Sequence, residues 1–305
     1  MPRKPKMASL QACQAEPAPA TKVEQRDPRY PARLLDLARP PMSLWVTGRL
    51  PAAQERSFAI VGARAATRVG CQSSQALAYG LARKGAAIVS GGAFGIDAAA
   101  HEGALAANAV TFAVLGCGTD IIYPDRHKEL FARVAIAGGL LSEYPPGTKP
   151  RPGQFPARNR IIAALADAVI VVEAAFRSGA LGTAARARDL GRPLFAVPGS
   201  PGTDALLHAG RAYPATSADE VEGSVQAIRA GGAVLPAAQP CLPSVQGPLA
   251  SILDALSTGA NTPADLCKRT AMALPAILAI LAEAELEGFV KRTAGNTYEV
   301  IGYAC

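Results

Sequence analysis

Short apolar runs alternate with stretches of helical periodicity between residues 58 and 200. Runs of this kind are typical of strands that are buried on both faces of a parallel sheet, with the intervening helices covering the faces. The pattern therefore predicts an α/β fold. Helices are expected over Ser73–Lys84, up to Leu105 and from Ile161. The predicted strands are Phe58–Val61, Ala86–Ser90, Thr111–Leu115, Gly139–Glu143, Ala168–Glu173 and Leu194–Val197.

Glycine-bearing turns follow five of these strands. The carboxyl ends of parallel strands meet at one edge of the sheet, which is where open α/β sheets bind ligands. Glycine lets the backbone approach a ligand closely or adopt a positive φ, although any single glycine can equally well serve a tight turn. Five such turns at one edge favour a binding crevice. The glycines expected to support it include Gly62, Gly91, Gly92 and Gly95.

Residues 155–187 carry most of the candidate chemistry. We expect Phe155, Arg158, Asn159 and Arg160 to lead from a loop into a helix. A strand follows, and it opens into the small residues 178–183, which start another helix. That geometry leaves backbone N–H groups of Ser178–Thr183, Gly179 among them, free to meet an anion. An aromatic ring can stack on a base and guanidinium groups match phosphate oxygens, so the segment predicts a site for nucleic acid or a nucleotide.

Each of these residues also has a purely structural interpretation. Phe155 could be an ordinary core aromatic, although its loop position beside Pro156 favours an exposed ring. Glu143 and Glu173 end two strands and could be catalytic, but we prefer the interpretation that they orient Arg158, Arg160 or Arg177.

Asp97 and His101 are four residues apart on one predicted helix. They could form an acid–base pair or half of a metal site, or they could tie the helix start to its neighbours by local hydrogen bonds. We prefer the hydrogen-bonding interpretation. The chain has no HExxH motif, and neither GxGxxG nor GxxxxGK[ST] occurs, which argues against ordinary dinucleotide and ATP sites. No metal or cofactor is expected.

Composition adds limits to this picture. Half of the 305 residues are apolar and 18% are charged, as in a globular protein. The net charge of +7 favours an acidic partner such as nucleic acid, though it does not require one. The six cysteines are scattered without a CxxC pair, which suits a reducing compartment. The chain shows neither a membrane-spanning run nor a signal peptide, so we expect a cytoplasmic protein.

The organisation along the chain predicts two folded units. Residues 1–26 are expected to be a disordered lead-in, 27–57 a short helix and strand that extend the main unit, 58–230 the sheet domain and 231–247 a linker. Residues 248–305 predict three helices and a two-stranded wing that turns at Gly295-Asn296, which describes a winged helix. Its third helix, over Leu274–Glu287, is apolar and acidic where a reader of duplex DNA would carry Arg, Lys, Asn or Gln.

Several strings of residues resemble the DNA-processing protein A (DprA/Smf) family. They are Ile60–Arg64, Gly95–Asp97, His101, Ala113–Gly116, Tyr123-Pro124, Leu141–Pro146, Phe155–Leu165, Val171–Glu173, Ser178-Gly179, Gly191-Arg192 and Ala196–Gly199, in this order. The resemblance spans about residues 30–221, and the tail resembles the winged helix that some members carry.

The resemblance implies a Rossmann-like, doubly wound domain that binds single-stranded DNA without sequence preference, usually as a homodimer. It further implies a protein that protects incoming strands during natural transformation and loads a RecA-type recombinase onto them. Carried over to matched positions, the DNA site comprises Arg64, Phe155, Arg158, Asn159, Arg160 and Gly179. The family is not known for a catalytic reaction.

Two alternatives belong to other functional classes. Nucleotide phosphoribohydrolases of the lysine-decarboxylase-like (LOG) type have a related sheet and a PGGxGTxxE motif whose glutamate serves glycosidic cleavage. Gly182-Thr183 aligns with the GT, but Arg186 stands at the glutamate position, and a guanidinium cannot do acid–base work. A protein-interaction scaffold is the other alternative, and the arginines expected beside a glycine-rich edge argue against it.

Overall fold

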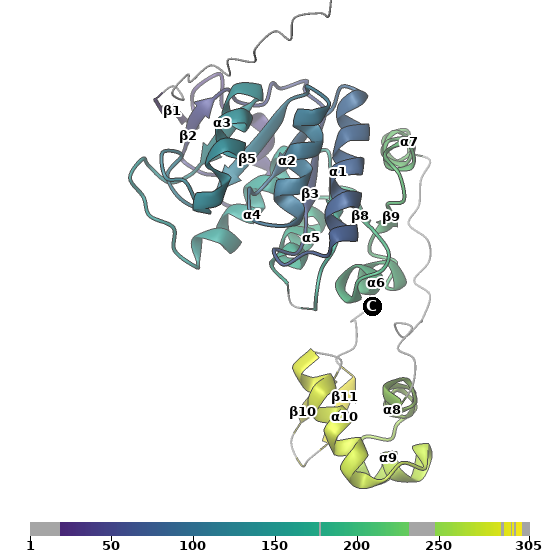
Figure 1. Ribbon diagram of the computed structural model, residues 1–305. Helices are drawn as coiled ribbons and strands as arrows, with labels where there is room; N and C mark the ends of the chain where they lie inside the picture. The colour runs from purple at the N-terminus through teal and green to yellow at the C-terminus, as the bar shows by residue number, and fades with distance from the viewer. Residues whose placement is uncertain are drawn as a thin grey trace, which may run out of the picture.

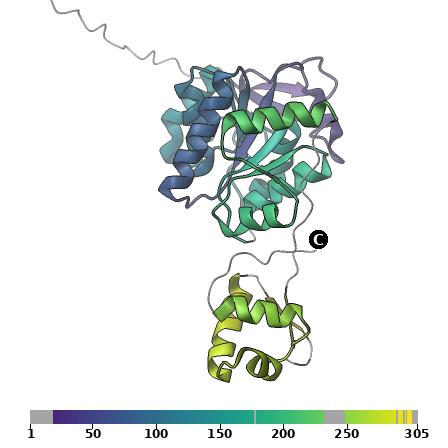
Figure 2. The ribbon, with the colours of Figure 1, turned by 90° about the vertical axis from the view of Figure 1, so that its right-hand side faces the viewer.

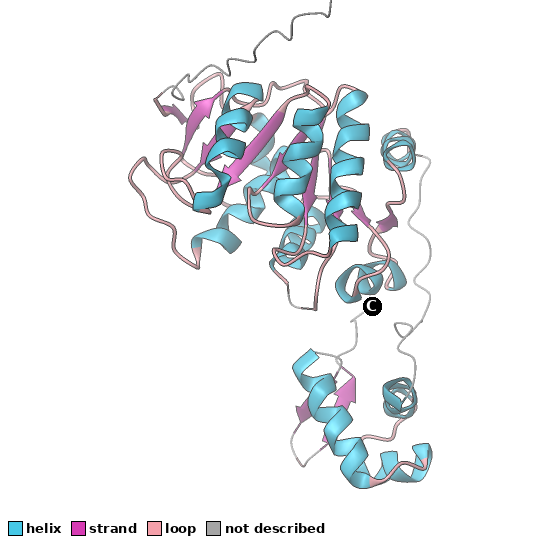
Figure 3. Ribbon diagram, viewed as in Figure 1, coloured by secondary structure: helices cyan, strands magenta, loops and turns pink. Residues whose placement is uncertain are grey.

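The computed structural model describes residues 19–176, 178–231, 248–287, 290–293, 295 and 297–300. Most of them form an α/β unit with one nine-stranded sheet, shown in Figure 1 and by element type in Figure 3. Its strands are β1 (Thr21–Glu24), β2 (Ser43–Gly48), β3 (Ser57–Val61), β4 (Ala87–Ser90), β5 (Thr111–Leu115), β6 (Gly139–Ser142), β7 (Ala168–Val171), β8 (Leu194–Ala196) and β9 (Tyr213–Pro214).

The helices of this unit cover both faces of the sheet. They are η1 (Ala32–Asp36), α1 (Arg68–Arg83), α2 (Ile96–Ala106), η2 (Asp125–His127), α3 (Lys128–Ala137), α4 (Gln154–Leu165), α5 (Gly179–Asp189), α6 (Pro201–His208) and α7 (Ala218–Arg229). Apolar residues of η1, α4 and α5 pack on one face, and those of α1, α2, α3 and α7 pack on the other. In Figure 2, α7 lies in front, at the β9 end of the sheet.

The sheet order is β1-β2-β6-β5-β4-β3-β7-β8-β9. All neighbouring strands from β6 to β9 are parallel, while β1 and β2 are antiparallel. Side chains alternate between the faces as the pleat requires, so Ala59 and Val61 of β3 enter one core while Phe58 and Ile60 enter the other. The chain continues from β3 toward β4 on one side and meets β7 on the other, which makes β3–β7 the switch point of a doubly wound sheet.

The predicted strands of the sheet are confirmed to within two residues at each end. Two expectations about the edges of elements are wrong. Residues 21–24, expected within a disordered lead-in, form β1, which pairs with β2; residues 1–18 lie outside the described residues. Helix α1 starts five residues earlier than Ser73, because the Thr67 side chain accepts a hydrogen bond from Gly70 N–H and caps the helix there. The first five residues of the helix, Arg-Val-Gly-Cys-Gln, show no helical periodicity of apolar residues.

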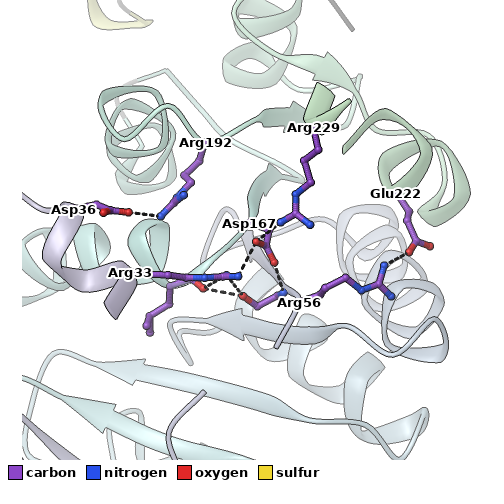
Figure 4. Close-up of polar contacts among 9 residues, drawn as sticks. Arg33, Asp36, Arg56, Asp167, Arg192, Glu222 and Arg229 are labelled. Atoms are coloured by element: carbon purple, nitrogen blue, oxygen red, sulfur yellow. Dashed lines mark hydrogen bonds and ion pairs between the residues drawn. The ribbon is translucent and has the colours of Figure 1, made fainter. Parts of the chain in front are cut away.

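Ion pairs hold the outer elements at the amino-terminal ends of the strands (Figure 4). Asp167, which precedes β7, pairs with Arg33 of η1 at 2.8 Å and with Arg229 of α7, and it accepts a 2.7 Å hydrogen bond from Ser57 N–H. Arg56 pairs with Glu222 of α7 in the same region. The edge of the sheet at which the parallel strands begin is therefore occupied by structural contacts. The opposite edge, at which these strands end, is left for a ligand.

The C-terminal helices and strands build a second small core. The elements are α8 (Pro248–Ser257), α9 (Pro263–Thr270), α10 (Leu274–Glu287), β10 (Val290–Thr293) and β11 (Thr297–Val300), and they confirm the predicted three helices and wing. The Thr262 side chain accepts from Asp265 N–H and caps α9. Ile252, Leu266, Ile277 and Leu281 are among the buried residues of this core. Asn296 of the expected turn lies outside the described residues.

None of the described helices is long and apolar enough to cross a membrane.

Candidate functional site

A cavity of about 200 Å³ opens at the switch point of the sheet. It lies between the turn after β3, the start of α4 and the start of α5, and this is the crevice that a doubly wound sheet offers to ligands. Sequence reasoning placed several of these residues in one pocket, and the structure brings Gly62, Arg64, Phe155, Arg158, Asn159, Ser178 and Gly179 together.

The turn after β3 presents the Arg64 side chain, which is exposed. Its backbone is fixed from two sides: Ala63 N–H donates to the Glu173 carbonyl at 2.8 Å, and Ile96 N–H donates to the Ala63 carbonyl at 3.2 Å. Gly95 has a φ of 74°, and a Cβ there would lie 2.4 Å from the Ala63 carbonyl oxygen. Only glycine accommodates that approach, so Gly95 supports the turn that carries Arg64.

Phe155 lies beneath the Arg64 guanidinium, 5.2 Å from the ring centroid to the Arg64 Cζ atom. The ring also meets Tyr123 at a centroid distance of 5.4 Å and rests on Gly116, where a Cβ would lie 2.9 Å away. The expectation that Phe155 sits in a loop is wrong, because it lies in the first turn of α4. The ring is half-buried and lines the cavity.

Arg158 is 4% exposed, whereas sequence reasoning expected a guanidinium at the surface. Its Nη1 atom donates to the Gly91 carbonyl at 2.6 Å and to the Val114 carbonyl, and its Nη2 atom lies 3.9 Å from Asp97. Burial lowers the pKa of Arg158 and raises the pKa of Asp97, while each charge partly offsets the effect on the other. Arg158 thus joins the turn after β4 to the end of β5 beneath the cavity.

Gly91 and Gly92 are confined by side chains below the cavity. A Cβ on Gly91 would lie within 2.6 Å of the Arg158 guanidinium, and one on Gly92 would lie 2.5 Å from the Phe131 ring. The Gly92 carbonyl also contacts His127 Nδ1 at 3.0 Å. These glycines make room for buried side chains.

The start of α5 forms the far wall. Ser178 is its N-cap residue, and among the described residues the Ser178 hydroxyl has no hydrogen-bond partner although the atom is buried. Asn159 donates from Nδ2 to the Gly179 carbonyl at 3.2 Å and accepts from Arg158 Nε at 3.0 Å. The first N–H groups of a helix lack intrahelical acceptors and carry a partial positive charge, so this wall is suited to an anion. The helix begins at Gly179, so the expected loop over residues 178–183 is shorter than predicted.

Arg160 is not part of the cavity. It is part-buried and pairs with Glu143 at 2.5 Å, as expected for an orienting carboxylate. Burial raises the pKa of Glu143, and the Arg160 charge opposes that rise. Glu143 Oε1 and Arg160 Nη1 have no further hydrogen-bond partner in the described part of the chain.

Glu173 does not orient an arginine among the described residues, and Arg177 lies outside them. Instead the Glu173 carboxylate accepts from the backbone N–H of Thr67 at 3.1 Å and from its hydroxyl at 2.7 Å. A Cβ on Gly70 would lie 2.1 Å from the same carboxylate. Glu173 therefore stabilises the positive end of α1 and, with its carbonyl, fixes the turn of Arg64.

Asp97 and His101 act locally, as preferred above. Asp97 accepts from Ala93 N–H at 3.3 Å, and His101 Nδ1 contacts the Thr111 hydroxyl at 2.8 Å. Burial lowers the pKa of His101 to about 3, with smaller effects from His127 and Arg158, so its imidazole is neutral. Within the described residues, no group of three His, Cys, Asp or Glu side chains is arranged to hold a metal ion.

Sequence reasoning missed the side chains of Thr183, Ala93 and Asp97 as lining residues of the cavity. Thr183 lies one helical turn after Gly179, and that spacing was the available signal. Ala93 and Asp97 reach the cavity because the turn after β4 packs against the turn after β3, which no local pattern encodes.

Comparison with known proteins gives a consistent result. A model described as DNA recombination-mediator protein A matches residues 22–226, and a DprA winged helix domain model matches residues 236–296. The putative DNA processing protein DprA of Mycobacterium tuberculosis is 48% identical over 198 residues, a match that spans 62% of this chain. The chain covers about half (51%) of that relative's length.

Two solved structures are similar to this chain. DNA processing protein A from Streptococcus pneumoniae is 40% identical with a TM-score of 0.64, covering 67% of this chain and 74% of that protein. DNA processing protein A from Helicobacter pylori, studied for its single-stranded DNA binding mode, is 32% identical with a TM-score of 0.61. The match covers 70% of this chain and 97% of that protein. Because the family model covers more than half of the sequence, the chain belongs to the DNA recombination-mediator protein A family.

Proposed function

We propose that this chain is a sequence-independent single-stranded DNA-binding protein that acts as a recombination mediator. One observation carries the proposal: a charged guanidinium, an aromatic ring and a helix N-terminus surround one cavity at the carboxyl edge of the sheet. The Helicobacter pylori relative, which binds single-stranded DNA, supports it.

The site supports backbone recognition rather than base reading. Arg64 and the free N–H groups at the start of α5 provide donors for phosphate oxygens. Phe155 lines the cavity with a half-buried ring, and any base can stack on that ring once the Arg64 guanidinium above it turns to a phosphate, since every base has a π-face. The site therefore binds single strands of any sequence, and a paired base in a duplex is not free to stack there.

The finer biological role follows from the family. We propose that the protein protects incoming DNA during natural transformation and loads a RecA-type recombinase onto it, that it works as a homodimer, and that it does so in the cytoplasm. The matched family is described as one of DNA recombination mediators, and the Mycobacterium tuberculosis relative is described as a DNA processing protein. The functional unit of DNA binding is assigned to residues 58–230, with residues 248–305 as a separate winged helix.

Binding of fluorescent oligonucleotides tests the proposal. The full chain is titrated into a single-stranded oligonucleotide, the same sequence as a duplex, and a second single strand of different sequence, each at several salt concentrations. Preference for both single strands over the duplex, with affinity that falls linearly on a log–log plot against salt, is expected. Equal affinity for the duplex, or no binding at low salt, would overturn the proposal.

The enzyme alternative gains no support from the structure. Arg186, at the position of the glutamate that glycosidic cleavage requires, is on α5 and pairs with Asp189 at 3.4 Å. A carboxylate is thus missing from the position where the chemistry needs it. Incubation with nucleoside monophosphates, followed by chromatography for the free base, is expected to show no turnover.

A further inference from the structure

A second, smaller cavity adjoins the candidate site on the other side of Phe155. It shares Arg64, Ala93, Phe155 and Arg158 with the first cavity, so these residues form the wall between the two. Its remaining walls are apolar or glycine: Gly91, Gly92, Phe94, Leu115, Gly116, Tyr123 and Pro124. None of the lining residues described carries a carboxylate, whereas Asp97 lines the first cavity.

Two aromatic rings of this cavity remain exposed although their neighbours hold them in place. Phe94 is 42% and Tyr123 43% exposed. Phe94 meets the His127 ring edge-on at 4.7 Å, and His127 is in turn tied to the Gly92 carbonyl. Tyr123 packs against Phe155. Large aromatic side chains are usually covered, and exposed apolar surface next to a binding site commonly marks an extension of that site.

We propose that this second cavity holds a nucleobase, which stacks on Tyr123 or Phe94 while its neighbour in the strand occupies the first cavity. This inference rests on the proposed function. The occupant is argued from continuity, because one strand that passes Arg64 and Phe155 reaches both cavities without a gap. Charge agrees, since the exposed guanidinium of Arg64 in the shared wall favours a polyanion and none of the described lining residues carries a carboxylate.

The lining also predicts how this base is recognised. Apolar walls and ring faces offer stacking but few groups that distinguish one base edge from another. The second cavity therefore adds affinity for a longer strand without adding sequence preference.

The test combines variants with oligonucleotides that lack one base. Binding of a short thymidine oligonucleotide is measured for the wild type, Tyr123→Ala, Phe94→Ala and Tyr123→Phe, and then with a single abasic position moved along the strand. Tyr79→Ala is the matched control. Tyr79 is about as exposed (44%), but it lies near the C-terminal end of α1 and lines neither cavity. Circular dichroism melting checks that each variant is folded.

We expect Tyr123→Ala or Phe94→Ala to weaken binding roughly 5- to 100-fold, the range for losing one stacked base, while Tyr123→Phe and Tyr79→Ala bind as the wild type does. At one position along the strand, removal of the base should weaken binding to the wild type. The same missing base should have less effect on binding to the Ala variant that lacks the ring on which this base stacks. If both Ala variants match the wild type while Arg64→Ala binds weakly, the second cavity holds no base and only this inference fails. A wild type that binds no single strand refutes the proposed function itself.

Discussion

The guanidinium of Arg64 lies over the ring of Phe155, with its Cζ atom 5.2 Å from the ring centroid. A cation on the face of an aromatic ring is attracted by the negative charge of that face, which fixes both side chains in one arrangement. In the proposed function the pair combines a phosphate donor and a stacking surface. Its two members are separable by mutation, because one carries charge and the other does not.

Arg64→Ala is expected to weaken binding of all single strands alike and to reduce the slope of log affinity against log salt by about 1. The physical reason is the loss of one cation that neutralises a phosphate. Fluorescence anisotropy at four or more salt concentrations measures the slope. Arg83→Ala serves as the matched control, because Arg83 is an exposed arginine in the last turn of α1, and it should leave affinity and slope unchanged. An unaltered slope in Arg64→Ala would contradict the phosphate role.

Phe155→Ala is expected to weaken binding by about 1–3 kcal/mol with little change in the salt slope, since stacking releases no counterions. Phe155→Tyr retains a ring and should bind nearly as tightly as the wild type. The same salt titration measures both effects. Wild-type affinity in Phe155→Ala would show that the ring only fills the space above Gly116.

Arg158→Ala is expected to destabilise the fold by about 3–5 kcal/mol, because it removes a buried charge that contacts Asp97 and two backbone carbonyls. Unfolding by urea without DNA measures this change in the free energy of unfolding. Arg64→Ala, which removes an exposed arginine, should unfold at nearly the wild-type urea concentration. Should Arg158→Ala keep wild-type stability and lose DNA affinity, the residue would be a direct ligand instead of a support.

The free energy of unfolding should depend on pH through His101. Its pKa is about 3 in the folded protein against an ordinary value of 6.5, so the unfolded chain binds one more proton between these values. The free energy of unfolding is therefore highest above pH 6.5, where His101 is neutral in both states, and it decreases as the pH falls toward 3. Between pH 8 and pH 5 His101 lowers it by about 2 kcal/mol.

His101→Gln removes this titration while an amide can still contact the Thr111 hydroxyl. Urea unfolding of both proteins at pH 8 and pH 5 should show that the wild type loses about 2 kcal/mol more than the variant. Asp97 and Glu143, whose raised pKa values act in the opposite direction, are present in both proteins, so the difference isolates His101. Parallel pH curves for the two proteins would refute the assignment.

The arginines of α4 show where sequence reasoning stops. Arg158 and Arg160 look equivalent in the sequence, yet Arg158 turns inward beneath the cavity and Arg160 pairs with Glu143 outside it. Successive helical residues point about 100° apart, so Arg158 and Arg160, two residues apart on α4, point in nearly opposite directions. The start of α4 decides which of them faces the crevice, and the Phe155 loop predicted from the sequence set that start too late.

The sequence by itself determined the strands, most helices, the parallel sheet and the edge at which the cavity opens. These depend on burial patterns and on glycine in turns, both of which are local properties of the chain. Only the tertiary structure decided that Glu173 binds Thr67 at the start of α1, that Gly91 makes room for Arg158, and that Tyr123 and Phe94 line a second cavity beside Phe155. Each of these contacts joins residues from different elements, and their distance and orientation follow from how the helices pack on the sheet.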